Sequence, residues 1–148
     1  MGKTAFRAMT VDDVKAVAAL DLKCFGSRDS FSREYFLYVA QNENCEYIIG
    51  EREGKIIACA GAEIVSDAAE IETIAVDPKY RRQGIGTLIL IQLMLAIKRR
   101  GADFIFLEVR PSNTGAIKLY KDFGFQIIDT VENFYSDEDA FVMGWSFS

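Results

Sequence analysis

Hydrophobic and polar positions alternate with two different periods along the chain, which predicts an α/β fold. Period-two runs predict strands at Phe6 and at residues 47–51, 56–65, 70–76, 104–110, 125–130 and 140–147. Helical runs are expected at residues 11–23, 32–40, 87–100 and 114–123. The expected N-caps are Thr10, Ser32 and either Ser112 or Asn113.

The order of these elements predicts a meander, then a crossover, then a closing hairpin. The helix at 87–100 is apolar on nearly every side and is followed by Gly101, so we expect it to be largely buried. It returns the chain so that strand 104–110 runs parallel to strand 70–76. Open α/β sheets bind ligands at the carboxyl ends of such strands, so a crevice is expected there.

A glycine-containing turn joins strand 70–76 to helix 87–100, with the sequence Arg81-Arg82-Gln83-Gly84-Ile85-Gly86. Such a turn presents unpaired backbone N–H groups and the positive end of the helix dipole, which suits a phosphate or pyrophosphate. Position 89 is Ile, so G-x-G-x-x-G is incomplete, and no G-x-x-x-x-G-K-[ST] occurs. The turn therefore predicts an anion site that belongs neither to a Rossmann fold nor to a P-loop.

The charge of the chain is distributed unevenly. The 148 residues carry a net charge of −5, and their length and 50% hydrophobic content suit one domain, residues 1–148. Residues 79–121 hold nine Lys and Arg against two acidic residues, Asp103 and Glu108. One basic segment in an acidic protein fits a small polyanionic ligand better than a nucleic acid, which needs an extended basic face.

Residue types that are absent narrow the chemistry. The chain has no histidine, which excludes a Ser-His or Cys-His nucleophile, and its three cysteines form no C-x-x-C pair, which argues against a metal site. No apolar run approaches the ~20 residues of a membrane span, and no apolar signal core opens the chain, so no membrane partner and a cytoplasmic location are expected. Carboxylates, tyrosines, lysines and backbone remain for catalysis.

The glycine hexapeptide matches R/Q-x-x-G-x-G/A, the pyrophosphate loop of the GCN5-related N-acetyltransferases (GNAT), and the whole chain resembles that family. The resemblance implies a mixed, mostly antiparallel seven-stranded sheet with about four helices, splayed between strands 4 and 5. It also implies acetyl-CoA as the acetyl donor and no metal. The cofactor contacts that it implies are the residues Ile74, Ala75, Val76, Arg81, Arg82, Gln83, Gly84, Ile85, Gly86, Thr87, Asn113 and Tyr120.

Acetyl transfer to an amine needs a base for the amine and a proton for the leaving thiolate. Glu108 shares a strand face with Phe104 and Phe106, so we expect its carboxylate to be partly desolvated, with a pKa raised towards that of a useful base. The alternative to this catalytic role is a structural one, in which Glu108 forms an ion pair with Arg110. Tyr120 stays protonated at neutral pH and can serve as the acid, or it can simply pack against the sheet.

Two further carboxylates keep the identity of the base open. In other branches of the family the base lies on the strand before the pyrophosphate loop, where this chain has Glu70 and Glu72. Alternation places both on the face of Ile74 and Val76. Glu72 is accordingly a candidate base or amine-binding residue, and its structural alternative is a solvated strand end.

The match is more specific around residues 107–125. The runs L-E-V-R-P-S-N, A-I-K-L-Y and F-G-F resemble the signature of the RimI branch, whose members acetylate the N-terminal amine of ribosomal protein S18. This resemblance implies Glu108 as general base and Tyr120 as general acid. Tyr135, in N-F-Y, and Phe31, where the branch has tryptophan, are the expected acceptor-binding residues together with Glu72.

The leading hypothesis is an N-acetyltransferase acting on the N-terminal α-amine of a protein, possibly a ribosomal protein, as a monomer or weak homodimer. An acetyltransferase for a lysine side chain or a small amine is the nearest alternative. A non-catalytic acyl-CoA sensor is a third, disfavoured because Glu108 and Tyr120 are both present. The acidic run Asp137-Glu138-Asp139 suits a basic substrate or a solvated loop equally well.

Overall fold

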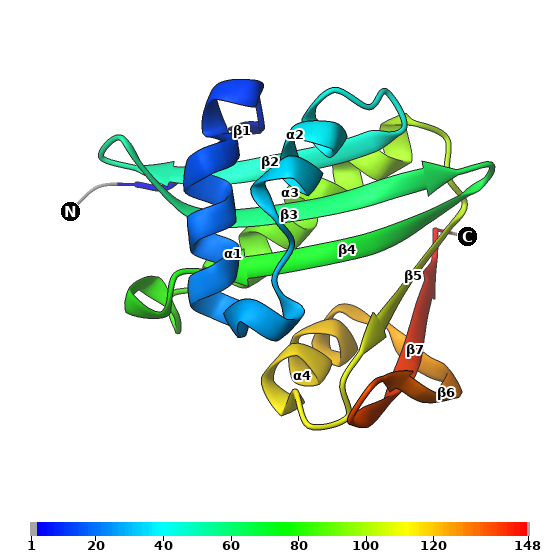
Figure 1. Ribbon diagram of the computed structural model, residues 1–148. Helices are drawn as coiled ribbons and strands as arrows, with labels where there is room; N and C mark the ends of the chain where they lie inside the picture. Colours follow the sequence, from blue (N-terminus) through cyan, green and yellow to red (C-terminus); the bar gives the residue numbers. More distant parts are fainter. Residues whose placement is uncertain (1–2, 148) are drawn as a thin grey trace.

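A computed structural model describes residues 3–147 and contains one seven-stranded sheet with the strand order β1-β2-β3-β4-β5-β7-β6 (Figure 1). All neighbouring strands are antiparallel except the parallel pair β4 and β5. The strands are β1 Ala5–Ala8, β2 Cys45–Arg52, β3 Lys55–Val65, β4 Ala68–Val76, β5 Phe104–Val109, β6 Gln126–Tyr135 and β7 Glu138–Ser146. The mixed α/β fold expected from the sequence is confirmed.

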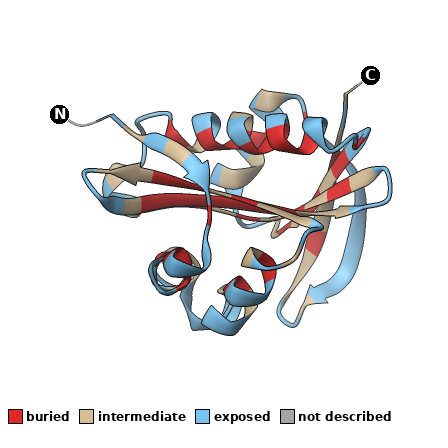
Figure 2. Ribbon diagram, turned by 90° about the horizontal axis from the view of Figure 1, so that it is seen from above, coloured by how far each residue is buried: buried red, intermediate tan, exposed pale blue. Residues whose placement is uncertain are grey.

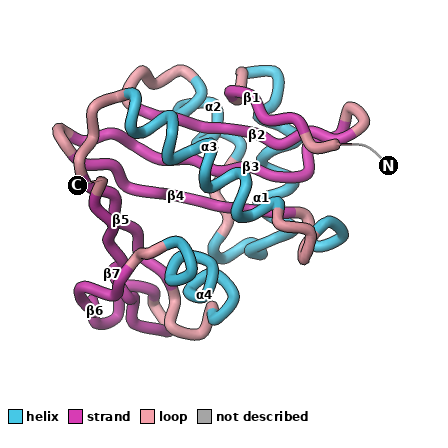
Figure 3. The backbone as a smooth tube through the Cα atoms, turned by 180° about the vertical axis from the view of Figure 1, so that it is seen from behind, coloured by secondary structure: helices cyan, strands magenta, loops and turns pink. Residues whose placement is uncertain are grey.

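Helices cover both faces of this sheet (Figure 2). The four α-helices are α1 Val14–Asp29, α2 Arg33–Ala40, α3 Ile85–Arg99 and α4 Thr114–Phe123, and two short 3-10 turns are η1 Val11–Asp13 and η2 Pro78–Tyr80. Helices α1 and α2 lie on one face, while α3 crosses the other face, behind β2 to β4 in Figure 1 and in front of them in Figure 3. No helix in residues 3–147 is both long and apolar enough to cross a membrane.

The two faces bury separate hydrophobic clusters. The larger cluster joins α3 and α4 to the sheet and includes Ile89, Leu93, Ile105 and Tyr120. The smaller joins α1 and α2 to β2, β3 and β4; its members include Val17, Phe36, Tyr47, Ile49 and Ala75. Strand β4 contributes Ala69, Ile71, Ile74 and Val76 to the larger cluster and Ala75 to the smaller, so the alternation along the strand shifts by one residue. The cause is a β-bulge at Glu72, since Ile71 pairs with Ala62 and Thr73 with Gly61. The expectation that Glu70 and Glu72 share the face of Ile74 and Val76 is therefore wrong.

Side-chain caps determine where the helices around the site begin. The Ser32 hydroxyl accepts from the Tyr35 N–H at 3.1 Å, and the Asn113 amide oxygen accepts from the Ala116 N–H at 3.1 Å. Asn113, rather than Ser112, is thus the cap of α4. At the start of η1 the Asp13 carboxylate accepts a hydrogen bond from the Thr10 N–H at 2.8 Å. Thr10 is therefore the N-cap residue, and the side chain of Asp13, three residues later, binds its backbone N–H.

The two largest differences from the predicted element boundaries have physical reasons. Helix α1 continues past Lys23 to Asp29, broken by Gly26, whose φ of 76° only glycine adopts readily. Strand β6 continues to Tyr135, five residues past its expected end. It is the outer strand of the sheet and nearly all of its residues are exposed, so no alternation marked its length.

The parallel pairing of β4 and β5 is short. Only the pairs Ala68–Phe104, Ala69–Ile105 and Glu70–Phe106 are formed. Beyond Glu70 the two strands diverge, and β5, β7 and β6 turn away from the rest of the sheet (Figure 1). This divergence is the splay expected between strands 4 and 5, and it opens the sheet beside two cavities.

Candidate functional site

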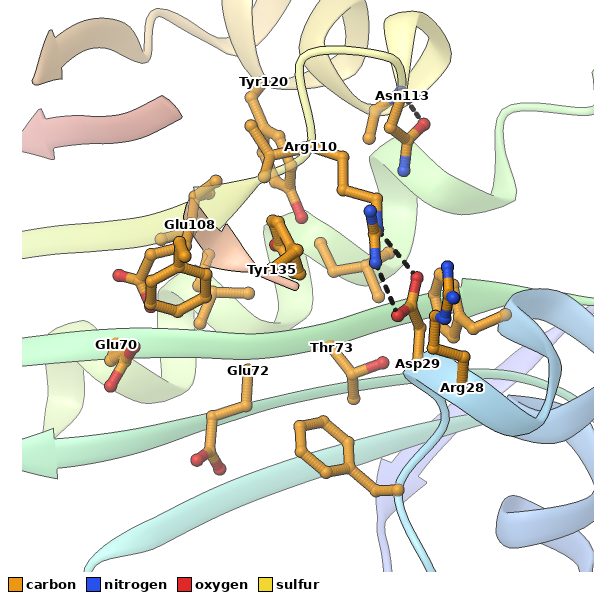
Figure 4. A pocket seen from close by; sticks show the side chains of 18 residues that line it. Arg28, Asp29, Glu70, Glu72, Thr73, Glu108, Arg110, Asn113, Tyr120 and Tyr135 are labelled. Atoms are coloured by element: carbon orange, nitrogen blue, oxygen red, sulfur yellow. Dashed lines mark hydrogen bonds and ion pairs between the residues drawn. The ribbon is translucent and has the colours of Figure 1, made fainter. Parts of the chain in front are cut away.

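Two cavities meet where β4 and β5 separate. One, of about 630 Å³, lies beside the glycine loop and the start of α3. The other, of about 480 Å³, lies beside the carboxylates of β4 and β5 (Figure 4). Five residues line both cavities: Phe25, Ile74, Asn113, Ala116 and Tyr120. A ligand in one cavity can therefore touch a ligand in the other. We call them the loop cavity and the carboxylate cavity.

The backbone of the glycine loop is shaped to bind an anion. Gly84 is the N-cap of α3 with φ of 77°, and Arg82 is also left-handed, with φ of 64°. The first helical hydrogen bond runs from the Leu88 N–H to the Gly84 carbonyl at 3.0 Å, so the N–H groups of residues 85–87 have no partner within the helix. These donors and the helix dipole favour a negative group, as expected from the sequence.

Most of the residues expected to bind a cofactor line the loop cavity. Those that line it are Ile74, Val76, Arg81, Arg82, Gly84, Ile85, Gly86, Asn113 and Tyr120. Among the described lining residues, Ala75, Gln83 and Thr87 do not occur. Ala75 is 2% exposed in the cluster on the α1 side, so its side chain points away from the cavity. Gln83 instead accepts a hydrogen bond from Arg52 at 3.1 Å.

The other end of the site contains the two carboxylates Glu70 and Glu108, both of which line the carboxylate cavity. The pKa of Glu70 is raised to about 7, first because burial disfavours its charge and second because Glu108 lies within hydrogen-bonding reach with a like charge. From the sequence, Glu70 was only an alternative base. The structure places it directly beside Glu108.

Tyr120 links the two cavities. It projects from α4, lines both spaces and is 6% exposed. Burial, and then the neighbouring Tyr135, raises the pKa of its phenol, so the hydroxyl is protonated at neutral pH. The described residues offer no hydrogen-bond partner to that hydroxyl. It is available to donate a proton into the site.

Glu72 is not a solvated strand end. Its carboxylate accepts hydrogen bonds from the Tyr35 hydroxyl at 2.5 Å and the Tyr47 hydroxyl at 2.7 Å. Burial, together with the charge of Glu72, raises the pKa of both tyrosines and keeps them as donors. Phe31, the other acceptor-binding candidate on this side, stacks on Tyr35 with ring centroids 4.5 Å apart. Both candidates are thus anchored by one tyrosine.

Arg110 does not pair with Glu108, so that structural alternative is wrong. Its guanidinium forms a two-pronged ion pair with Asp29, with both N–O distances 2.8 Å, and also contacts Asp137 at 2.8 Å and Glu138 at 3.2 Å. It lies 4.1 Å from the centroid of the Tyr135 ring. Arg110 therefore ties the end of α1 to the turn between β6 and β7, and these two segments border the carboxylate cavity.

The acidic run 137–139 is largely occupied within the protein. Asp137 binds Arg28 at 2.7 Å as well as Arg110, Glu138 accepts from the Ser112 N–H at 2.8 Å, and Asp139 accepts from the Asn133 N–H at 2.9 Å. The run therefore has internal partners, which neither the basic-substrate interpretation nor the solvated-loop interpretation predicted. Most of its partners lie 26 to 109 positions away, so no local sequence pattern indicated the network.

Comparison with known proteins identifies the family. A model of the acetyltransferase (GNAT) family matches residues 14–125, which is more than half of the chain.

The chain belongs to the GNAT acetyltransferase family.

Individual relatives agree with this assignment. The chain is 35% identical over 146 residues to a putative [ribosomal protein bS18]-alanine N-acetyltransferase of Bacillus subtilis, covering 95% of this chain and 94% of that protein. It is 30% identical over 146 residues to the N-alpha-acetyltransferase daf-31 of Caenorhabditis elegans, covering 93% and 79%.

A solved structure shows the same likeness in three dimensions. The ribosomal-protein-S18-alanine N-acetyltransferase from Escherichia coli superposes with a TM-score of 0.89 at 31% identity, covering 99% of this chain and 95% of that one. The resemblance to the GNAT family and its RimI branch, and the assignment to the acyltransferases, are confirmed. In this GNAT chain the glycine loop, Glu108 and Tyr120 occupy one connected site.

Proposed function

We propose that this protein transfers the acetyl group of acetyl-CoA to the N-terminal α-amine of a protein, with Glu108 as general base and Tyr120 as general acid. The observation that carries the proposal is the junction of the two cavities at Tyr120, with an anion-binding loop on one side and a carboxylate on the other. The names of the relatives from B. subtilis, C. elegans and E. coli support the same reaction class.

The loop cavity fits the proposed donor. The free N–H groups at the start of α3, with Arg81 and Arg82, suit the pyrophosphate, and Ile74 and Val76 offer main chain along the diverging edge of β4 to the pantetheine. A Cβ on Gly86 would make ordinary van der Waals contact with Leu119 at 3.7 Å, whereas no atom lies within 4 Å of the Cβ position of Gly84, so the space beside Gly84 is open. The Asn113 side chain uses its oxygen as a cap, which leaves its N–H₂ group for the ligand.

The carboxylate cavity fits the acceptor. Bound acetyl-CoA would present its thioester carbonyl to the amine, and coenzyme A would leave as the thiol. Glu108 accepts the proton that the amine loses as the N–C bond forms, and Tyr120 donates a proton to the sulfur as the C–S bond breaks. Backbone N–H groups near Ile74 and Val76 polarise the carbonyl oxygen. Phe31, Glu72 and Tyr135 border the acceptor and orient it.

An α-amine suits this base better than a lysine does. The α-amine titrates near ~7.7–8.0 and the lysine amine near ~10.4, so at neutral pH a single carboxylate such as Glu108 finishes the deprotonation of the former more readily. The proposal therefore favours a protein N-terminus with a small first residue. The acetylation of ribosomal protein bS18 on alanine, named for two of the relatives, makes that N-terminus the first acceptor to test.

The test is an acetylation screen with peptides that differ in their N-terminal residue, including one with the bS18 N-terminus. We expect acetylation of a terminal Ala, located by mass spectrometry, and none when the terminus is capped even if lysines are present. Acetylation of lysine in a capped peptide at the rate of the free peptide would replace the proposal with the lysine alternative. A cytoplasmic location and a monomeric or weakly dimeric state stay predictions of the sequence.

A further inference from the structure

Glu70 and Glu108 face each other at the closed end of the splay. Glu70 pairs with Phe106 in the last formed pair of the β4–β5 ladder. Residues two apart on a strand point to the same face, so Glu108 is the next side chain on that face of β5. Both residues line the carboxylate cavity (Figure 4), and hydrogen bonding to Glu108 and its like charge contribute to the raised pKa of Glu70.

No cation of the cavity neutralises this pair. The two basic side chains among the described lining residues are Arg28 and Arg110, and both are bound to other carboxylates. The remaining titratable groups that face the cavity are Asp29 on α1, Glu72 on β4, Tyr120 on α4 and Tyr135 on β6. Each is an acid, and Asp29 and Glu72 already have partners of their own.

Two neighbouring carboxylates in one cavity, without a counter-ion, cannot both be ionised at low cost. We propose that Glu70 and Glu108 share one proton in the free protein, and that Glu70 acts as a positioning residue whose O–H orients the Glu108 carboxylate towards the acceptor amine. This inference rests on the proposed function, because it assigns Glu70 a part in the same reaction. It goes further by making the proton acceptor a pair instead of one residue.

The arrangement gives the base two useful properties. The hydrogen bond from Glu70 stops the Glu108 carboxylate from rotating, so one oxygen stays directed to the cavity. The shared proton also limits the pair to one negative charge, which a single ammonium group can balance on entering. The raised pKa of Glu70, at about 7, agrees with a pair that gains or loses this proton near neutral pH.

The experiment is a carbon-13 NMR titration of the glutamate side-chain carboxyl groups in the full-length protein. We expect a titration step near pH 7 in the wild type that is absent from Glu70→Gln and shifted to lower pH by at least one unit in Glu108→Gln. The exposed Glu132 on β6 supplies the control, since Glu132→Gln should keep the step. A wild type without a near-neutral step, or a step unchanged in Glu108→Gln, would overturn the proposal.

Kinetic measurements distinguish a positioning role of Glu70 from a purely structural one. Glu70→Gln retains a hydrogen-bond donor but not the titrating proton, so we expect its kcat to stay within about fivefold of wild type while the inflection of kcat/KM near pH 7 disappears. Glu70→Ala should lower kcat by a further tenfold or more. Equal kcat for these two variants would contradict the positioning role. If the wild type acetylates no peptide, the proposed function fails, whereas the NMR titration still decides the pair.

Discussion

The loop cavity presents mostly main chain and apolar side chains, whereas the carboxylate cavity presents charged side chains that are held by distant partners. In the first, the loop residues act through backbone N–H groups whose direction depends on Gly84 and the start of α3. In the second, Glu72 depends on two tyrosines and Arg110 on three carboxylates. Binding in the loop cavity is therefore encoded locally, and recognition in the carboxylate cavity is encoded by the whole fold.

This difference determines how readily the residues of each cavity can be substituted without altering its shape. A backbone site tolerates many side chains as long as the turn keeps its shape, so it suits a donor common to a whole family. A network of ion pairs and tyrosines changes when any member changes, so it suits an acceptor that differs between relatives. The variants below test whether donor and acceptor binding can be altered separately.

The largest effect is expected on the carboxylate side. Replacing Glu108 with Gln removes the proposed base without changing its size, so we expect kcat to fall by about 10²–10⁴ while the Kd for acetyl-CoA is unchanged. Steady-state kinetics and calorimetry measure the two quantities. Glu72→Gln is the comparison, since near-normal turnover in Glu108→Gln beside an inactive Glu72→Gln would move the base to β4.

The loop side should respond to charge. Gly86→Asp places a carboxylate where the backbone approaches the donor's pyrophosphate, so we expect acetyl-CoA to bind about 10- to 100-fold more weakly. The shift in melting temperature that acetyl-CoA causes in the wild type should shrink accordingly. Gly86→Ala is the matched control, because its Cβ fits at 3.7 Å from Leu119 and adds no charge. A full thermal shift in the Asp variant would contradict the loop as the anion site.

A smaller effect is expected where Arg110 ties α1 to the turn between β6 and β7. Lysine keeps the charge of Arg110 but loses the two-pronged contact with Asp29 and the position of the guanidinium over the Tyr135 ring. For Arg110→Lys, as for Tyr135→Ala, we expect the peptide KM to rise about tenfold with little change in acetyl-CoA affinity. An equal loss of affinity for both substrates would show that the two sides are not separable.

The smallest effect concerns stability. The pKa of Glu70 is raised from its ordinary value to about 7 in the folded protein, so folding binds a proton and stability falls as pH rises from about 4.5 to 7. Glu70→Gln removes this dependence, so we expect its melting temperature to exceed that of wild type by roughly 2–4 °C at pH 8. At pH 4 the two should melt together. A wild type equally stable at both pH values would contradict the raised pKa.

The sequence predicted the loop side well because its determinants are contiguous. The hexapeptide 81–86, the following apolar helix and the preceding strand lie within about thirty residues, and each gives a local pattern. Three expected residues, Ala75, Gln83 and Thr87, do not line the loop cavity, and the side chain of Ala75 faces the other cluster. Strand alternation could have excluded Ala75, since it lies between Ile74 and Val76, which face the cavity.

For the carboxylate cavity, the sequence predicted which carboxylates are present but not what they bind. Glu70, Glu72 and Glu108 were all candidates from the sequence, but their partners were not foreseeable. Tyr35 lies 37 positions from Glu72, and Asp29 lies 81 positions from Arg110. Contacts at such separations follow from how α1, α2 and the closing hairpin pack on the sheet. The alternative in which Arg110 pairs with Glu108 was wrong because Arg110 binds carboxylates that only the fold brings near it.

The short ladder between β4 and β5 also bears on aggregation. Where the two strands separate, the sheet acquires two inner edges, and an unpaired edge is normally a template for another chain. Here the edges open onto cavities bordered by α1 and α4, and not onto the rim of the sheet. A slender ligand can enter and pair with them, but a folded neighbour cannot. The unpaired backbone groups of these inner edges are thus open to a ligand in the cavities and shielded from pairing with another copy of the chain.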